Sequence, residues 1–157
     1  MLTFTRGVLV TLARGCPSVF GLIALLALPT LFFGCSESPT SPSNYAPFSQ
    51  TDLRLGSGDE AATGKVLTVT YTGWLYDASQ IGQKGATFDS SVGRAPFTFT
   101  LGAGSVIAGW DQGLVGMKAG GLRRLVIPPS LAYGQGRVGP IPSNTTLLFE
   151  VELLEVK

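Results

Sequence analysis

Ionisable and nucleophilic side chains limit the chemistry that this sequence can support. The 157 residues include no histidine, which excludes Ser-His-Asp and Cys-His catalysis as well as imidazole metal sites. Cys16 and Cys35 both lie in the first quarter of the chain, so the presumptive globular part can hold neither an internal disulfide nor a thiolate metal cluster. Any reaction of the globular part must therefore proceed without a histidine base, a cysteine nucleophile or a metal held by these residues.

Two other patterns that suggest chemistry have simpler explanations. Glu150 and Glu152 could form a carboxylate pair for acid-base catalysis, but they alternate with apolar residues and are expected to face water. Residues 134–139 match the letters G-x-G-x-x-G of dinucleotide-binding loops. Pro140 and Pro142 deny this stretch the helix whose N-terminus would bind a pyrophosphate, so we predict a loop.

Apolar and polar residues alternate with a period of two in several stretches, which predicts half-buried strands. The alternation is clearest over residues 65–72, 96–101 and 147–154. Residues 122–127, which end at a Pro-Pro pair, are another candidate, and residues 51–55 form a short first one. The sequence thus predicts four or five antiparallel strands.

One segment has the apolar spacing of a helix. Within residues 106–114, Ile107, Trp110 and Leu114 fall at i, i+3 and i+7 on one stripe. A single short helix of this kind is best buried against the concave face of a twisted antiparallel sheet, which predicts an α+β fold. Turn-rich loops separate the elements, at residues 77–85, 102–104 and 134–144.

Short motifs follow one another over residues 48–157. They are VTYTGWL at 69–75, FDSS at 88–91, PFTF at 96–99, LG at 101–102, VIAGW at 106–110, GM at 116–117, AYG at 132–134, IP at 141–142 and LLF at 147–149. In their order, and near their spacing, these motifs resemble those of FKBP-type peptidyl-prolyl cis-trans isomerases. The family fold is an antiparallel sheet of five or six strands curled around one short α-helix. This expectation agrees with the periodicity of the sequence.

The resemblance implies a deep apolar pocket that binds a prolyl ring, with Trp110 as its floor. The residues that it implies as catalytic are Tyr71, Asp89, Ile107, Trp110, Tyr133 and Phe149. Those that it implies as substrate-binding are Phe88, Arg94, Phe97, Val106 and Ile141. The hydroxyl of Tyr133 and the backbone N–H of Ile107 would bind the carbonyls that flank the proline. Phe99 is expected in the core.

Two stretches depart from the family pattern. Residues 76–87 are longer than in the minimal family member, and residues 134–144 are slightly shorter, with Pro140 in place of an aliphatic residue and no rim histidine. Rapamycin and tacrolimus are ligands that the resemblance implies, and the altered rim bears on their affinity. The pocket floor is unchanged.

The implied reaction suits these residues. Rotation about an X-Pro amide faces a barrier of about 18–20 kcal/mol because resonance makes the C–N bond partly double. An acceleration of about four to five decades needs only about 5–7 kcal/mol of transition-state stabilisation. An apolar pocket that grips the twisted amide can supply this without histidine, metal, cofactor or nucleophile.

The N-terminus predicts export. Arg6 and Arg14 precede an apolar run at residues 19–33, and no acidic residue occurs before Glu37. This is the pattern of a signal peptide, and the positive residues favour a cytoplasmic N-terminal side. We therefore expect the globular part outside the cytoplasm.

The residues that end the apolar run resemble a bacterial lipobox, although Phe32 stands where an aliphatic residue is usual. We predict a signal peptide over residues 1–34 and a lipid on Cys35, with the outer membrane facing the periplasm favoured because Ser36 follows the cysteine. An uncleaved anchor is the alternative, since residues 16–34 are nearly long enough to span a bilayer.

The remaining predictions concern the linker and the partners. Residues 35–47 are rich in Ser and Pro and read as a linker to the isomerase domain at 48–157. With 13% charged residues and a net charge of +1, the chain lacks the basic surface that nucleic acid requires. We predict a monomer that acts on proline-containing polypeptides. The alternatives are a proline-loop binding module, a holdase chaperone and a purely structural lipoprotein.

Overall fold

The computed structural model of the chain describes residues 44–157, which lie in one compact unit, Glu37–Lys157. The predicted signal peptide at 1–34, the lipidation site Cys35 and most of the predicted linker at 35–47 lie outside the described residues. Within residues 44–157, no helix combines the length and the apolar character needed to cross a bilayer.

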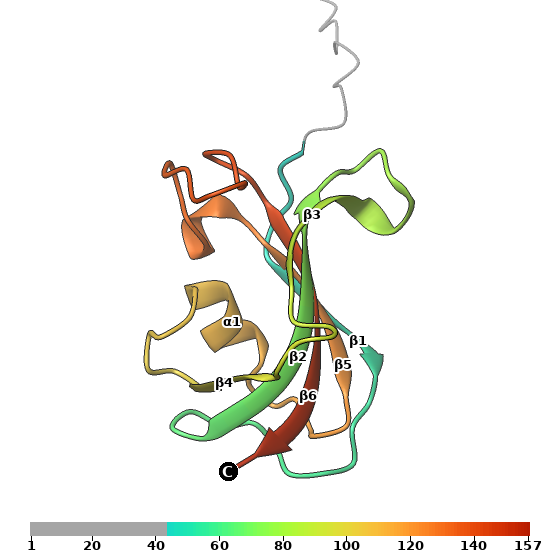
Figure 1. The fold of residues 1–157 in the computed structure, drawn as a ribbon, viewed down its shortest axis with the longest axis vertical. Coiled ribbons are helices and arrows are strands. Elements are labelled where there is room, and N and C mark those ends of the chain that lie inside the picture. The colour runs from blue at the N-terminus through green and yellow to red at the C-terminus, as the bar shows by residue number, and fades with distance from the viewer. Residues whose placement is uncertain (1–43) are drawn as a thin grey trace, which may run out of the picture. The chain divides into compact units, whose positions relative to one another are not determined.

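Six strands form one antiparallel sheet in the order β1-β5-β6-β2-β3, and β4 also pairs with β2 (Figure 1). Their bounds are β1 Ser49–Arg54, β2 Val66–Tyr76, β3 Lys84–Ser90, β4 Phe97–Thr100, β5 Leu122–Ile127 and β6 Leu147–Val156. Five of them correspond to the stretches predicted from periodicity. The sixth, β3, begins inside a stretch that the sequence predicted as a loop.

The single α-helix, α1 at Ala108–Gly113, lies against the hollow side of the curved sheet (Figure 1). Glycines allow this close approach. A Cβ built at Gly109 would lie 2.4 Å from Cγ2 of Ile127, and one at Gly113 would lie 2.7 Å from Cδ2 of Leu125. Both neighbours belong to β5, so these two glycines within α1 let the helix backbone pack directly on that strand.

The core lies between α1 and the concave face of the sheet. Alternate residues of the central strands, such as Leu67, Val69, Leu125 and Val151, are fully buried there. Burying a side chain of this size is worth about 1.5–3 kcal/mol. A smaller cluster of Tyr76, Val126 and Leu148 covers the other face of the same strands, and so the period-two alternation is lost near that end of the sheet.

The long stretch at 76–87 extends the β2–β3 connection beyond the sheet. A short 3-10 turn, η1 at Ile81–Gln83, forms its tip. A second 3-10 turn, η2 at Pro129–Leu131, follows β5. The β2–β3 extension and the loop at 134–144 protrude from the same end of the sheet, opposite the C-terminus (Figure 1).

Candidate active site

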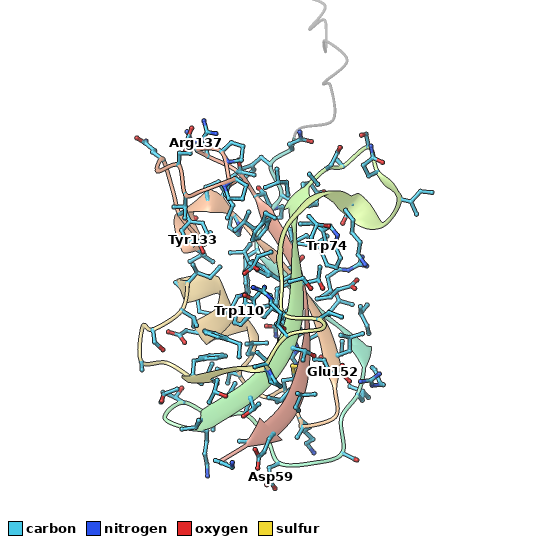
Figure 2. All side chains as sticks on the ribbon, in the orientation of Figure 1. Asp59, Trp74, Trp110, Tyr133, Arg137 and Glu152 are labelled. Carbon is cyan, nitrogen blue, oxygen red and sulfur yellow. The ribbon has the colours of Figure 1, made fainter. Side chains whose placement is uncertain are left out.

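A cavity of about 200 Å³ opens between α1 and the concave face of the sheet. Trp110 and Tyr133, which Figure 2 labels, lie on the α1 side of the sheet. The lining residues are Tyr71, Phe88, Asp89, Phe97, Ser105, Val106, Ile107, Trp110, Tyr133 and Phe149. They come from β2, β3, β4, the loop before α1, α1 itself, the segment after η2, and β6.

Trp110 forms the aromatic centre of this cavity. It is only 4% exposed, and its indole Nε1 has no hydrogen-bond partner within residues 44–157, so packing alone holds the ring. Tyr71 meets the indole edge-on with a centroid distance of 5.1 Å, and Phe149 does so at 5.3 Å. Such pairs contribute about 0.5–1.5 kcal/mol each beyond the area that they bury. The floor is therefore rigid and apolar.

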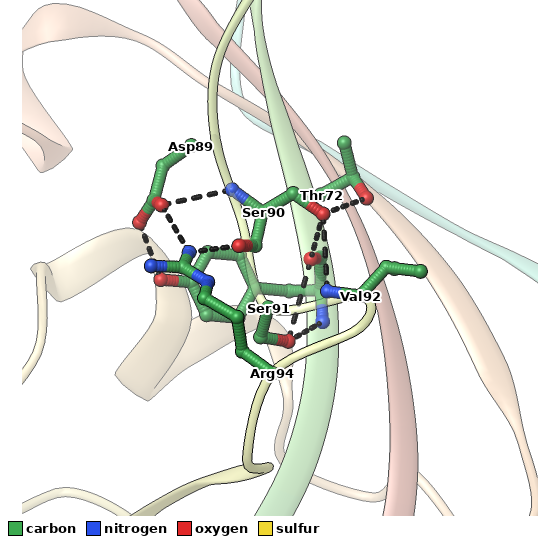
Figure 3. Close-up of polar contacts among 7 residues, drawn as sticks. Thr72, Asp89, Ser90, Ser91, Val92 and Arg94 are labelled. Atoms are coloured by element: carbon green, nitrogen blue, oxygen red, sulfur yellow. Dashed lines mark hydrogen bonds and ion pairs between the residues drawn. The ribbon is translucent and has the colours of Figure 1, made fainter.

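A polar network includes Asp89, which lines the cavity, and Arg94 (Figure 3). The Tyr71 hydroxyl donates a hydrogen bond to Oδ2 of Asp89 over 2.5 Å, and Arg94 binds Oδ1 of the same carboxylate over 2.6 Å. Burial, helped by the bond to Asp89, raises the pKa of Tyr71 to about 12.

The same contacts act in the opposite direction on the carboxylate. The hydrogen bond from Tyr71, supported by Arg94 and by the backbone N–H of Ser90, holds the pKa of Asp89 below its usual value against the effect of burial. At neutral pH the network therefore consists of a phenol and a carboxylate.

The loop before α1 supplies Ser105, Val106 and Ile107 to the cavity lining. Asp111 accepts hydrogen bonds from the N–H of Gly102 over 2.8 Å and of Gly104 over 3.1 Å, which ties the loop to the helix. Ile107 is the N-cap of α1, and its C=O accepts the N–H of Trp110 over 2.9 Å. The N–H of Ile107 donates no hydrogen bond within residues 44–157, so it is free to donate one to a substrate carbonyl.

The structure gathers nine of the eleven predicted site residues around the cavity. Arg94 lies outside the lining and contacts it through an ion pair with Asp89. Ile141 is absent from the cavity lining and packs in the core, where it is 4% exposed. Phe99 also lies in the core, as expected, with its ring 5.7 Å from that of Trp110.

Sequence reasoning missed Ser105, which lines the cavity one residue before Val106. Its place inside the motif region before VIAGW was the available signal. None of the residues in the β2–β3 extension lines the cavity, so the longer stretch at 76–87 contributes nothing to the cavity walls. In the described part of the chain, no three Cys, Asp or Glu side chains gather to hold a metal ion.

Comparison with known proteins identifies the family. The domain described as FKBP-type peptidyl-prolyl cis-trans isomerase matches residues 58–154. FK506-binding protein 2B of Rhizopus delemar is 48% identical over an alignment of 146 residues that covers 88% of this chain and 64% of the fungal protein. An FK506-binding protein of Neisseria meningitidis serogroup A is 53% identical over 107 residues, 67% of this chain and 92% of the bacterial protein.

Solved structures show the same fold. FkpA from Escherichia coli is similar with a TM-score of 0.61 and 41% identity, over 70% of this chain and 48% of that protein. AtFKBP13 is similar with a TM-score of 0.59 and 37% identity, over 70% of this chain and 93% of that protein. The chain belongs to the FKBP-type peptidyl-prolyl cis-trans isomerase family. The predicted α+β fold and the predicted enzyme class are thereby confirmed.

Proposed function

We propose that this chain catalyses cis-trans isomerisation of X-Pro bonds in proteins that fold outside the cytoplasm. The observation that carries the proposal is the aromatic cavity above Trp110, with Ile107, whose N–H donates no hydrogen bond within residues 44–157, and Tyr133 among its lining residues. A prolyl ring fits an apolar site of this kind. The two donors can bind the carbonyls on either side of the proline.

The geometry favours a twisted amide over a planar one. Twisting removes resonance and reduces the negative charge on the amide oxygen, so a water-poor cavity is less unfavourable for the twisted form. Contacts with Trp110 and Phe149 fix the ring, while the Ile107 N–H and the Tyr133 hydroxyl hold the chain on either side. Binding energy realised only in the twisted geometry lowers the rotation barrier.

FK506 and rapamycin are expected ligands of the same cavity. The relatives from Rhizopus delemar and Neisseria meningitidis are named as FK506-binding proteins. A ring of the size and apolar character of proline would occupy the floor above Trp110 in the same way. The shortened loop at 134–144 limits the contacts that the rest of such a ligand can make at the rim.

A refolding assay tests whether the chain isomerises a polypeptide substrate. The substrate is a single-domain protein whose slow refolding phase, of about tens to hundreds of seconds, is limited by one X-Pro bond. We expect catalytic amounts of the chain to shorten this phase, and rapamycin to abolish the effect. Suppressed aggregation at stoichiometric amounts, with an unchanged slow phase, would instead indicate a holdase or a binding module.

For the N-terminal part, we propose a bacterial lipoprotein that is cleaved before Cys35 and anchored by lipid in the outer membrane, facing the periplasm. The apolar run at residues 19–33 and the Gly34-Cys35 junction support the proposal. The Ser/Pro-rich stretch that follows would span at most about 30–40 Å, enough to keep the domain clear of the lipid surface.

Labelling with palmitate in a bacterial host tests the anchor. We expect the parent chain and Cys16→Ser to incorporate label and to fractionate with the outer membrane. Cys35→Ser should lose the label and leave that fraction. A membrane-bound chain that retains residues 1–34 and carries no label would contradict lipidation and favour an uncleaved anchor.

A further inference from the structure

We infer that Ser91 is a positioning residue for isomerisation, because it holds the backbone of Tyr71 and the segment that carries Asp89 in one fixed arrangement. The inference rests on the proposed isomerase function. It concerns a residue that does not line the cavity and would act only through Tyr71 and Asp89.

Tyr71 lies at a gap in the pairing of β2. Along one edge, β2 pairs with β4 from Val66 to Val69 and with β3 from Thr72 onward. Tyr71 falls between these two ladders, whereas on the opposite edge it stands across from Val151 of β6. An open gap would leave the backbone N–H and C=O of Tyr71 without a strand partner in a half-buried position.

Ser91 fills this gap with its side chain and its backbone together (Figure 3). Its Oγ accepts a hydrogen bond from the N–H of Tyr71 over 2.8 Å, and its own N–H donates to the C=O of Tyr71 over 2.9 Å. Ser91 is only 4% exposed, so water has little access to compete for these groups. A buried hydroxyl thus stands where a neighbouring strand would offer a carbonyl.

Ser90 adds a second connection beside the first. Its Oγ lies 2.9 Å from Oγ1 of Thr72 and donates to the C=O of Tyr71 over 3.2 Å. The guanidinium of Arg94 also hydrogen-bonds the backbone C=O of Ser90. The two serines therefore join the end of β3 to β2 at the place where regular pairing stops.

The same short segment fixes the carboxylate that Tyr71 contacts. Oδ1 of Asp89 accepts the backbone N–H of Ser90 over 2.8 Å, and Oδ2 accepts the Tyr71 hydroxyl over 2.5 Å. Tyr71 is thus held at its backbone by Ser91 and at its hydroxyl by Asp89. A change at the backbone contact should shift the ring against Asp89 and against Trp110, whose centroid lies 5.1 Å away.

The test compares Ser91→Ala, Ser91→Thr and Val156→Ala in the 157-residue chain, purified in a mild detergent. Val156 is a core residue at the end of β6 and does not line the cavity, so its truncation is a control for a loss of stability away from the site. We expect Ser91→Ala to lower kcat/KM for a Leu-Pro peptide by about tenfold. Ser91→Thr keeps the hydroxyl, so its kcat/KM should stay within about threefold of the parent value. The kcat/KM of Val156→Ala should stay within the same range.

Two further readouts separate positioning from a structural role. Adding Ser91→Ala to Tyr71→Phe should lower kcat/KM by far less than Ser91→Ala does alone, because both changes act on the same contact. Carbon NMR of the labelled tyrosine rings follows the phenol directly. The pKa of Tyr71, about 12 in the parent, should move back toward 10.0 in Ser91→Ala.

Equal activity losses in Ser91→Ala and Val156→Ala, or full additivity with Tyr71→Phe, would overturn the inference and leave Ser91 a structural residue. A folded parent chain without isomerase activity would contradict the proposed function instead, and the NMR titration would still report on Ser91. If Ser91→Ala does not fold, Ser91→Cys offers a weaker acceptor of similar size for the same comparison.

Discussion

At the scale of single residues, the site works through shape and fixed polar contacts. Asp89 is held as a carboxylate by Tyr71 and Arg94, and Tyr71 is held as a phenol by burial and by Asp89. No histidine occurs in the chain, so no imidazole titrates near neutral pH. The electrostatics of the site should therefore be constant over the physiological range.

This constancy predicts a flat pH profile with an acidic limit. Because the folded pKa of Asp89 lies below its unfolded value, its contribution to stability is complete above that unfolded value, at about pH 4, and is lost as the pH falls through the folded pKa. We expect kcat/KM to be constant from about pH 5 to 9 and to fall below about pH 4. Asp89→Asn should have a lower kcat/KM at neutral pH. Its kcat/KM should also decrease less below about pH 4, because the variant has no carboxylate at this position to protonate. A midpoint near neutral pH would contradict this account.

The residue scale also shows what sequence can and cannot reveal about the site. Trp110, Tyr71 and Phe149 could be assigned from their motifs because the resemblance implied that all three line one pocket. Ser91 belongs to the same FDSS motif, yet its contact depends on where β3 stops pairing with β2. Ile141 was predicted to bind substrate from the IP motif at 141–142, but a motif does not reveal whether a side chain faces the cavity or the core.

At the scale of elements, α1 and β5 are joined by close backbone packing. Gly109 faces Ile127, which is fully buried and cannot move aside without disturbing the core. Because Trp110 follows Gly109 directly, the same contact sets the depth of the cavity floor. A change at this glycine should therefore affect both stability and the site.

Gly109→Ala is expected to destabilise the fold by about 1–3 kcal/mol, because overpacking outweighs the gain of about 1 kcal/mol in helix propensity. Chemical denaturation measures the free energy of unfolding. Gln112→Ala, an exposed change on the same helix, should stay within about 0.5 kcal/mol of the parent. A stabilised Gly109→Ala chain would show that α1 does not pack on β5 as closely as described.

The β2–β3 extension is fixed to the convex face of the sheet by one lysine. Nζ of Lys84 lies 2.8 Å from Oε1 of Glu150 and 4.3 Å from the centroid of the Trp74 ring. Arg124 binds the same Glu150 oxygen over 2.9 Å. These contacts are half-buried, so they should contribute more than an exposed ion pair does.

Lys84→Met should therefore lower the free energy of unfolding by about 1 kcal/mol. The matched comparison is Lys157→Met, whose ion pair with Glu155 has side chains 68% and 52% exposed against 31% and 18% for Lys84 and Glu150. That change should cost less than about 0.5 kcal/mol. Neither variant should alter kcat/KM, and a large activity loss in Lys84→Met would tie the extension to the reaction.

At the scale of the whole molecule, the sequence predicted the central strands and the helix, but it did not predict the edge strand β3. Strands β2, β5 and β6 each turn one apolar face to the main core, and α1 carries a single apolar stripe. Strand β3 lies at the edge of the sheet, where its residues are half-buried or exposed and its register with β2 shifts twice. Such a strand has no period-two signal, which explains why it was not predicted as a strand.

The central claim is that the Trp110 cavity isomerises X-Pro bonds. The most direct measurement is the cis-to-trans relaxation of short Leu-Pro and Phe-Pro peptides with the 157-residue chain, with Trp110→Ala, with Asp89→Ala and with rapamycin present. We predict relaxation well above the spontaneous rate, a loss of about tenfold or more in each variant, and suppression by rapamycin. A folded chain that leaves the peptides at their spontaneous rate would contradict the account.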